Sequence, residues 1–143
     1  MKNLASQLLV LAVAIMFATP ARSHDLSGKW DLKIEDKGHH VVTLLVVEFT
    51  SRRARSCMSG DWMGVTVLSA TTKDKDFFPV DAPLSFEVAR NQLTIGRNEI
   101  CDAYLRLSGP LSQDSVRGDY YSFGLGGSTP LGFFTLTRQS RGK

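Results

Sequence analysis

The stretch Gly28-Lys29-Trp30-Asp31-Leu32-Lys33-Ile34-Glu35 decides the fold of this chain. Apolar Trp30, Leu32 and Ile34 alternate with charged residues, which is the period-two pattern of a β-strand that has one face in water. Asp36-Lys37-Gly38 follows directly and carries the residue types of a turn. The pattern therefore predicts that an all-β domain begins here.

Working outward from this strand, the rest of the chain shows seven further β-rich segments and no run of helical period. Turn residues lie between them, at Arg90-Asn91-Gln92, at Gly109-Pro110 and from Gly124 to Pro130. Eight sequential strands with short turns predict an all-β, eight-stranded antiparallel up-and-down β-barrel, with a two-sheet sandwich as the alternative. The further strands are expected at His39–Thr50, Met58–Ala70, Leu84–Val88, Leu93–Gly96, Ile100–Leu107, Val116–Phe123 and Phe133–Thr137.

Two segments break the simple alternation. The run from Val41 to Val47 is almost continuously apolar, so we expect either that both of its faces are covered or that its outer face meets a partner. The long connection from Thr71 to Pro83 contains adjacent Phe77 and Phe78 among charged residues. We expect this aromatic pair to tuck under the barrel, with a binding lip as the alternative.

The first 23 residues are typical of a cleaved bacterial export signal. Lys2 precedes an apolar run from Leu8 to Phe17, and Ala21-Arg22-Ser23 is a small-x-small cleavage site before His24. The run is too short for a membrane span of roughly 20 residues. We therefore expect a signal peptide at 1–23, a single barrel domain at 24–143, a periplasmic or secreted location, and no stable membrane insertion.

The charge of the mature chain argues against nucleic-acid binding. The whole chain has a formal net charge of +3, and removal of residues 1–23 takes away two basic residues and no acid, which leaves +1. A nucleic-acid interface needs clustered excess positive charge.

The two cysteines, Cys57 and Cys101, both lie in the mature part. In an exported protein, two cysteines predict one disulfide. A metal-binding or catalytic pair is the alternative, but the spacing differs from C-x-x-C and no histidine is close in sequence.

Residues for catalysis are few. The mature chain has only three histidines, His24, His39 and His40, and the adjacent pair would point to opposite faces of a strand. Asp61 and Asp102 are the carboxylates that the disulfide would bring closest. We expect no enzymatic activity, no metal and no cofactor.

Candidate contacts for a ligand or partner are aromatic and basic. Trp62, Tyr104, Tyr120 and Tyr121 could line a barrel mouth, with the glycine-rich segment from Gly124 to Ser128 as a lid. A basic cluster just before Cys57 could dock an anion or an acidic partner surface through its guanidinium groups. It consists of Arg52, Arg53 and Arg55.

Gly28-Lys29-Trp30 at the start of the first strand resembles the G-x-W motif of the calycin superfamily, which includes lipocalins, avidins and bacterial periplasmic metalloprotease inhibitors. The resemblance implies an eight-stranded barrel whose first-strand Trp30 is covered by an arginine of the last strand. Arg138 is the matching residue. The resemblance implies the fold of this superfamily, but it does not assign a ligand-binding residue to this chain.

These patterns predict a non-enzymatic exported binding protein. It would bind a small apolar or anionic molecule in the barrel mouth, or interact with a protein of the envelope. The alternative is an inhibitor of a secreted or foreign hydrolase, such as a protease or lysozyme, that acts through a projecting loop or its N-terminus. A solvent-connected apolar cavity of about 300 Å³ or more would favour the small-molecule carrier, whereas a filled barrel with an exposed protruding loop would favour the inhibitor.

Overall fold

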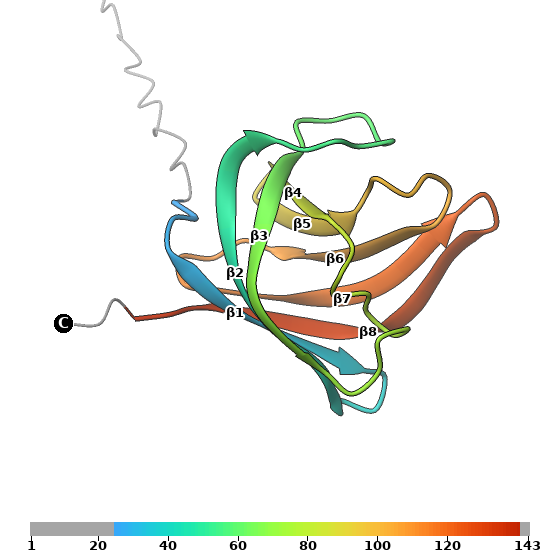
Figure 1. The fold of residues 1–143 in the computed structure, drawn as a ribbon, viewed down its shortest axis with the longest axis horizontal. Helices are drawn as coiled ribbons and strands as arrows, with labels where there is room; N and C mark the ends of the chain where they lie inside the picture. The colour runs from blue at the N-terminus through green and yellow to red at the C-terminus, as the bar shows by residue number, and fades with distance from the viewer. Residues whose placement is uncertain (1–24, 141–143) are drawn as a thin grey trace, which may run out of the picture.

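The computed structural model describes residues 25–140, and in this part the chain consists of strands and connections without a helix. Eight strands close into an antiparallel barrel in chain order, which confirms the predicted fold (Figure 1). The expected leader at 1–23 and the cleavage point before His24 lie outside the described residues. The strands are β1 (Lys29–Asp36), β2 (Val41–Arg53), β3 (Met63–Thr72), β4 (Leu84–Ala89), β5 (Gln92–Arg97), β6 (Tyr104–Pro110), β7 (Ser115–Gly124) and β8 (Gly127–Arg138).

Several expected boundaries are wrong. β2 runs to Arg53 instead of Thr50, and β6 begins at Tyr104 instead of Ile100. β3 begins at Met63 instead of Met58, because the preceding residues fold across the outside of the barrel. β6 continues through Gly109 to Pro110, which pairs with Gln92, so the turn comes after the proline. β8 begins at Gly127, because the residues expected in a long loop pair with β7 and leave a tight hairpin tip.

The barrel is closed where the first strand meets the last. Trp30 of β1 is the register partner of Arg138 of β8 and is fully buried. The Arg138 guanidinium lies over the indole, 4.3 Å from the ring centroid. The indole N–H donates to the Leu26 carbonyl at 3.0 Å. Arg138 also donates to the carbonyls of Ser27 and Asp25 and pairs with Asp114 at 3.1 Å. One guanidinium therefore ties together the segment before β1, the last strand and the β6–β7 connection.

Apolar side chains from alternate positions of the strands fill the interior. Three residues of β1, namely Trp30, Leu32 and Ile34, are fully buried, as their alternation predicts. The same cluster includes Leu45, Val47, Leu93, Ile95, Leu107, Val116, Phe134 and Leu136.

The β3–β4 connection packs under the barrel, as expected for its aromatic pair. Phe78 is 2% exposed, and the rings of Phe77 and Phe78 lie 5.2 and 5.7 Å from the ring of Tyr120 in edge-on geometry. The Tyr120 hydroxyl donates to the Phe77 carbonyl. Burial raises the pKa of this phenol well above its ordinary value, so Tyr120 stays a neutral donor. Tyr120 is thus part of the core.

The β2–β3 side of the barrel is partly uncovered. The Leu44 side chain, on the outer face of β2, is 49% exposed. β3 pairs with β4 at only three positions, Met63, Gly64 and Val65. Among residues 25–140 there is no helix that could cross a membrane.

A buried arginine on the outer face of the barrel

The connection between β2 and β3, residues 54–62, lies as a flap against the outside of the barrel. The predicted disulfide is confirmed: Cys57 of the flap is bonded to Cys101 of the β5–β6 connection, with 5.5 Å between their Cα atoms. The Cys57 amide donates to the Asn98 carbonyl at 2.9 Å. Gly60 has a φ of +128°, and a Cβ there would come within 2.6 Å of a Glu87 carboxylate oxygen. The positive φ favours glycine at the point where the flap turns over β4.

Small residues make room under the flap. Gly64, Ser85 and Gly96 are register neighbours on β3, β4 and β5, and Gly96 in turn pairs with Arg106 of β6. A Cβ on Gly96 would lie 3.3 Å from the Cδ atom of Arg106, so the arginine stem passes directly over this glycine. Leu105 and Leu107, on either side of Arg106, contribute to the core. By strand alternation Arg106 therefore projects from the outer face.

The Arg106 guanidinium is held between two aromatic rings. Its Cζ atom lies 4.5 Å from the centroid of Trp62, which belongs to the flap, and 4.9 Å from that of Phe123 on β7. Trp62 is itself 3% exposed and donates its indole N–H to the Ser59 carbonyl. Such cation–π contacts stabilise a guanidinium that has lost much of its water. The disulfide-anchored flap thus supplies one of the two rings.

Arg106 is 9% exposed, yet its Nε and Nη2 atoms are buried without a hydrogen-bond partner in the described part of the chain. These two atoms form one edge of the guanidinium, with parallel N–H groups that match the two oxygens of a carboxylate. Glu87, the acid whose charge raises the pKa of Arg106, accepts a hydrogen bond from the Asp61 amide at 3.1 Å. A buried donor without an acceptor is costly, and here two of them face the same way.

Desolvation lowers the pKa of Arg106, while Tyr121, Glu87 and Tyr104 raise it. Arginine starts from a pKa so high that the group stays charged at neutral pH. The site is therefore a permanent buried cation.

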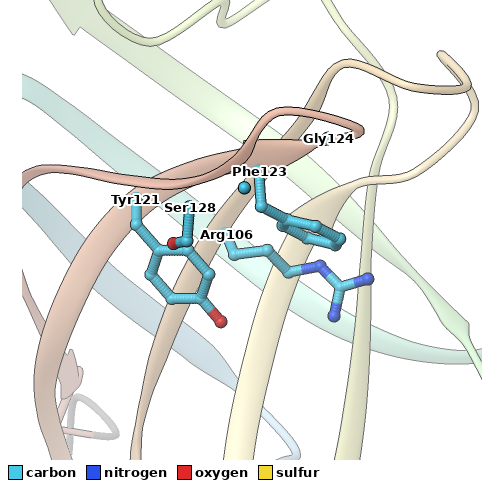
Figure 2. Close-up of a pocket in the computed structure, with 6 residues that line it drawn as sticks. Arg106, Tyr121, Phe123, Gly124 and Ser128 are labelled. Carbon is cyan, nitrogen blue, oxygen red and sulfur yellow. The ribbon is translucent and has the colours of Figure 1, made fainter.

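An open surface pocket of about 330 Å³ lies beside this cation (Figure 2). Tyr121 and Phe123 supply its aromatic wall and Ser128 a hydroxyl group, while Gly124 and Gly127 form the tip of the β7–β8 hairpin around it. Its volume is within the range of small-molecule sites. The walls can accommodate an apolar body next to an anionic head.

The structure brings together three of the sequence-predicted contact residues. Trp62 and the pair Tyr104 and Tyr121 surround Arg106, with the Tyr104 ring stacked 4.9 Å from Phe123. They occupy the outer face of the sheet, because Tyr104 and Tyr121 alternate with core-facing neighbours. Tyr120 lies apart from them inside the barrel.

The basic cluster at the end of β2 and the start of the flap does not line this cavity. Arg52, Arg53 and Arg55 are exposed, and Arg53 pairs with Asp61 at 2.9 Å. Asp61, one of the two carboxylates that the sequence placed near the disulfide, therefore forms an ion pair with Arg53 at the flap. His39 stacks on Phe133 at 4.5 Å, and the described residues hold no cluster of three potential metal ligands.

Sequence reasoning missed Arg106 and Phe123. The signal was present in Tyr104-Leu105-Arg106-Leu107, where a tyrosine and an arginine share one face of a strand whose other face is apolar. What the pattern could not show is that the flap would cover this face.

Fold and site together define a closed eight-stranded up-and-down β-barrel with a disulfide-anchored flap and an arginine–aromatic cavity on its outer face. Comparisons of the chain with protein-family models, with curated proteins and with solved structures find no match. What the chain binds is therefore inferred from the side chains of the site.

Proposed function

We propose that this protein is a non-enzymatic, exported binding protein of calycin-like type that holds a small carboxylate ligand at Arg106. The observation that carries the proposal is the edge formed by Nε and Nη2 of Arg106, two buried atoms without a hydrogen-bond partner among the described residues. A carboxylate would satisfy both donors at once and neutralise the buried charge.

The cavity walls narrow the class of ligand. Tyr121 and Phe123 favour a flat or apolar body, and Ser128 can donate one further hydrogen bond. Because the two nitrogen atoms are buried, a carboxylate reaches them only when a neighbouring side chain or the β7–β8 tip moves aside. The flanking Gly124 and Gly127 make that tip easier to move.

Export is supported by the disulfide, since such bonds persist in oxidising compartments. The calycin-like assignment is supported by the closed eight-stranded barrel and by the guanidinium of Arg138 over Trp30.

Arg106→Met tests the carboxylate site, with benzoate as the probe and benzamide as its neutral analogue. We expect benzoate to bind the unmodified protein, benzamide to bind at least about tenfold more weakly, and Arg106→Met to lose benzoate binding. Titration calorimetry at constant ionic strength measures the affinities.

The melting temperature separates this role from a structural one. Methionine keeps the apolar contact with both rings and removes an unpaired buried charge, so we expect unchanged or higher thermal stability. Arg55→Met, at an exposed position, is the matched control and should retain binding. A marked loss of stability in Arg106→Met, with equal binding of benzoate and benzamide to the unmodified protein, would contradict the proposal.

A second candidate is the inhibitor of a secreted or foreign hydrolase. The observation that favours it is Leu125, 96% exposed at the tip of the β7–β8 hairpin, which projects from the barrel (Figure 1). Apolar side chains displayed on a projecting loop are suited to enter a partner's cleft.

For this candidate, Leu125→Asp is expected to abolish inhibition of a secreted protease or lysozyme and to leave the melting temperature unchanged, because the side chain has almost no contacts to lose. Activity assays of such hydrolases with and without the protein provide the measurement. Equal inhibition by the variant would exclude the hairpin tip as the inhibitory element.

A further inference from the structure

One edge of β3 is unpaired over most of its length. β3 pairs with β2 from Met63 to Thr72 but with β4 only from Met63 to Val65. Within residues 25–140, no backbone hydrogen bond joins the stretch 66–72 to the β3–β4 connection that follows it. The N–H and C=O groups on this side of residues 66–72 are therefore open to another strand.

This edge has a register shift at Leu68 but lacks the charged residues and prolines that usually protect an exposed strand. Residues 66–72 read Thr-Val-Leu-Ser-Ala-Thr-Thr, without a charge or a proline. Exposed edges commonly carry lysine or proline, which block pairing with other chains. The four consecutive residues from Leu68 to Thr71 are all exposed, so both faces of the strand are accessible here.

Apolar surface flanks the open edge. Leu68 is 44% exposed, and Leu44, which is 49% exposed, pairs with Thr71 across the β2–β3 ladder. The apolar Val41–Val47 run thus has one face in the core and an outer face that no described residue covers at Leu44. A strand added to β3 would extend the sheet next to both leucines.

We propose that the open edge of β3 pairs antiparallel with β3 of a second copy of this chain, which forms a two-fold symmetric dimer with a sheet that continues across the interface. A neutral segment places no like charges across the two-fold axis. The antiparallel arrangement also brings Lys73 of one copy to the Thr66 end of the other. At that end, Glu48 of β2 is the register neighbour of Thr66. Lys73 of one copy would therefore lie on the same side as Glu48 of the other copy, and these two charges have opposite sign.

Two pairs of charge variants test the dimer. Ser69→Lys with Thr71→Lys places two lysines at outward-facing positions of the edge, and Ser69→Glu with Thr71→Glu places two acids there. We expect the protein produced from the complete sequence to sediment as a dimer, and each charged variant to dimerise at least about tenfold more weakly. A mixture of the lysine and glutamate variants should recover a dimer, because opposite charges then face each other.

The matched control is Thr135→Lys with Thr137→Lys, which adds the same charge to β8, a strand paired on both sides. This control should remain a dimer. Amide hydrogen exchange should show residues 66–72 protected at high concentration and exposed on dilution. All of these readouts are independent of benzoate binding, so failure here leaves the Arg106 site intact.

Two results would overturn the dimer. One is a monomeric unmodified protein at every concentration, and the other is a dimer that persists in both charged variants. If the monomer instead protects residues 66–72 when a foreign extended peptide is added, the edge serves another protein.

Discussion

Trp30→Ala is expected to lower the free energy of unfolding by about 3–5 kcal/mol, the usual cost of truncating a fully buried aromatic side chain. Trp30 is completely buried, touches Phe49 edge-on at 6.0 Å and lies under the Arg138 guanidinium. Alanine would leave a cavity at the point where β1 meets β8. Urea unfolding followed by far-ultraviolet circular dichroism measures the loss without relying on tryptophan fluorescence.

Leu44→Ala is the control for this substitution, since Leu44 lies in the same sheet but is half exposed. We expect it to cost less than about 1 kcal/mol, because a surface side chain has little burial to lose. A loss below about 1 kcal/mol for Trp30→Ala as well would show that the indole does not support barrel closure.

Removal of the disulfide with Cys57→Ser and Cys101→Ser is expected to cost about 4 kcal/mol of stability. The bond closes a loop with a sequence separation of 44, and the entropy that the unfolded chain regains grows with the length of such a loop. Chemical denaturation of the double variant and of the reduced unmodified protein should agree.

The same change should also alter the site. The disulfide anchors the flap that carries Trp62, and Trp62 covers one face of Arg106. We expect a red-shifted Trp62 fluorescence and altered benzoate affinity in the double variant. An unchanged emission spectrum would mean that the flap is held by its hydrogen bonds, such as that from the Cys57 amide to the Asn98 carbonyl.

The fold could be predicted because the residues that specify each strand and each turn lie within short stretches of the sequence. Alternation in Trp30–Ile34 shows which side chains face the core, and turn residues such as Asp36–Gly38 show where the strands reverse. Closure follows from strand number and short connections, since consecutive antiparallel strands leave only the first and last edges to be joined.

The site could be predicted only in part. The sequence predicts Trp62 and Tyr104 as candidate contacts that line the mouth of the barrel. In the structure both residues instead lie around Arg106 on the outer face of the sheet. The predicted start of β3 was wrong because residues 58–62 belong to the flap, whose Cys57 is bonded to Cys101 of the β5–β6 connection.

The sequence by itself determined the strands, their inward faces and the presence of one disulfide, because each depends on residue types within a short stretch or on a single pair of cysteines. Only the tertiary structure decided that Gly64, Ser85, Gly96 and Arg106 form one row across four strands, since that row depends on pairing register between segments far apart in the chain. Register also decided that β3 separates from β4 after Val65 and leaves an open edge. Both the buried cation and the open edge arise from these long-range pairings, which no local pattern specifies.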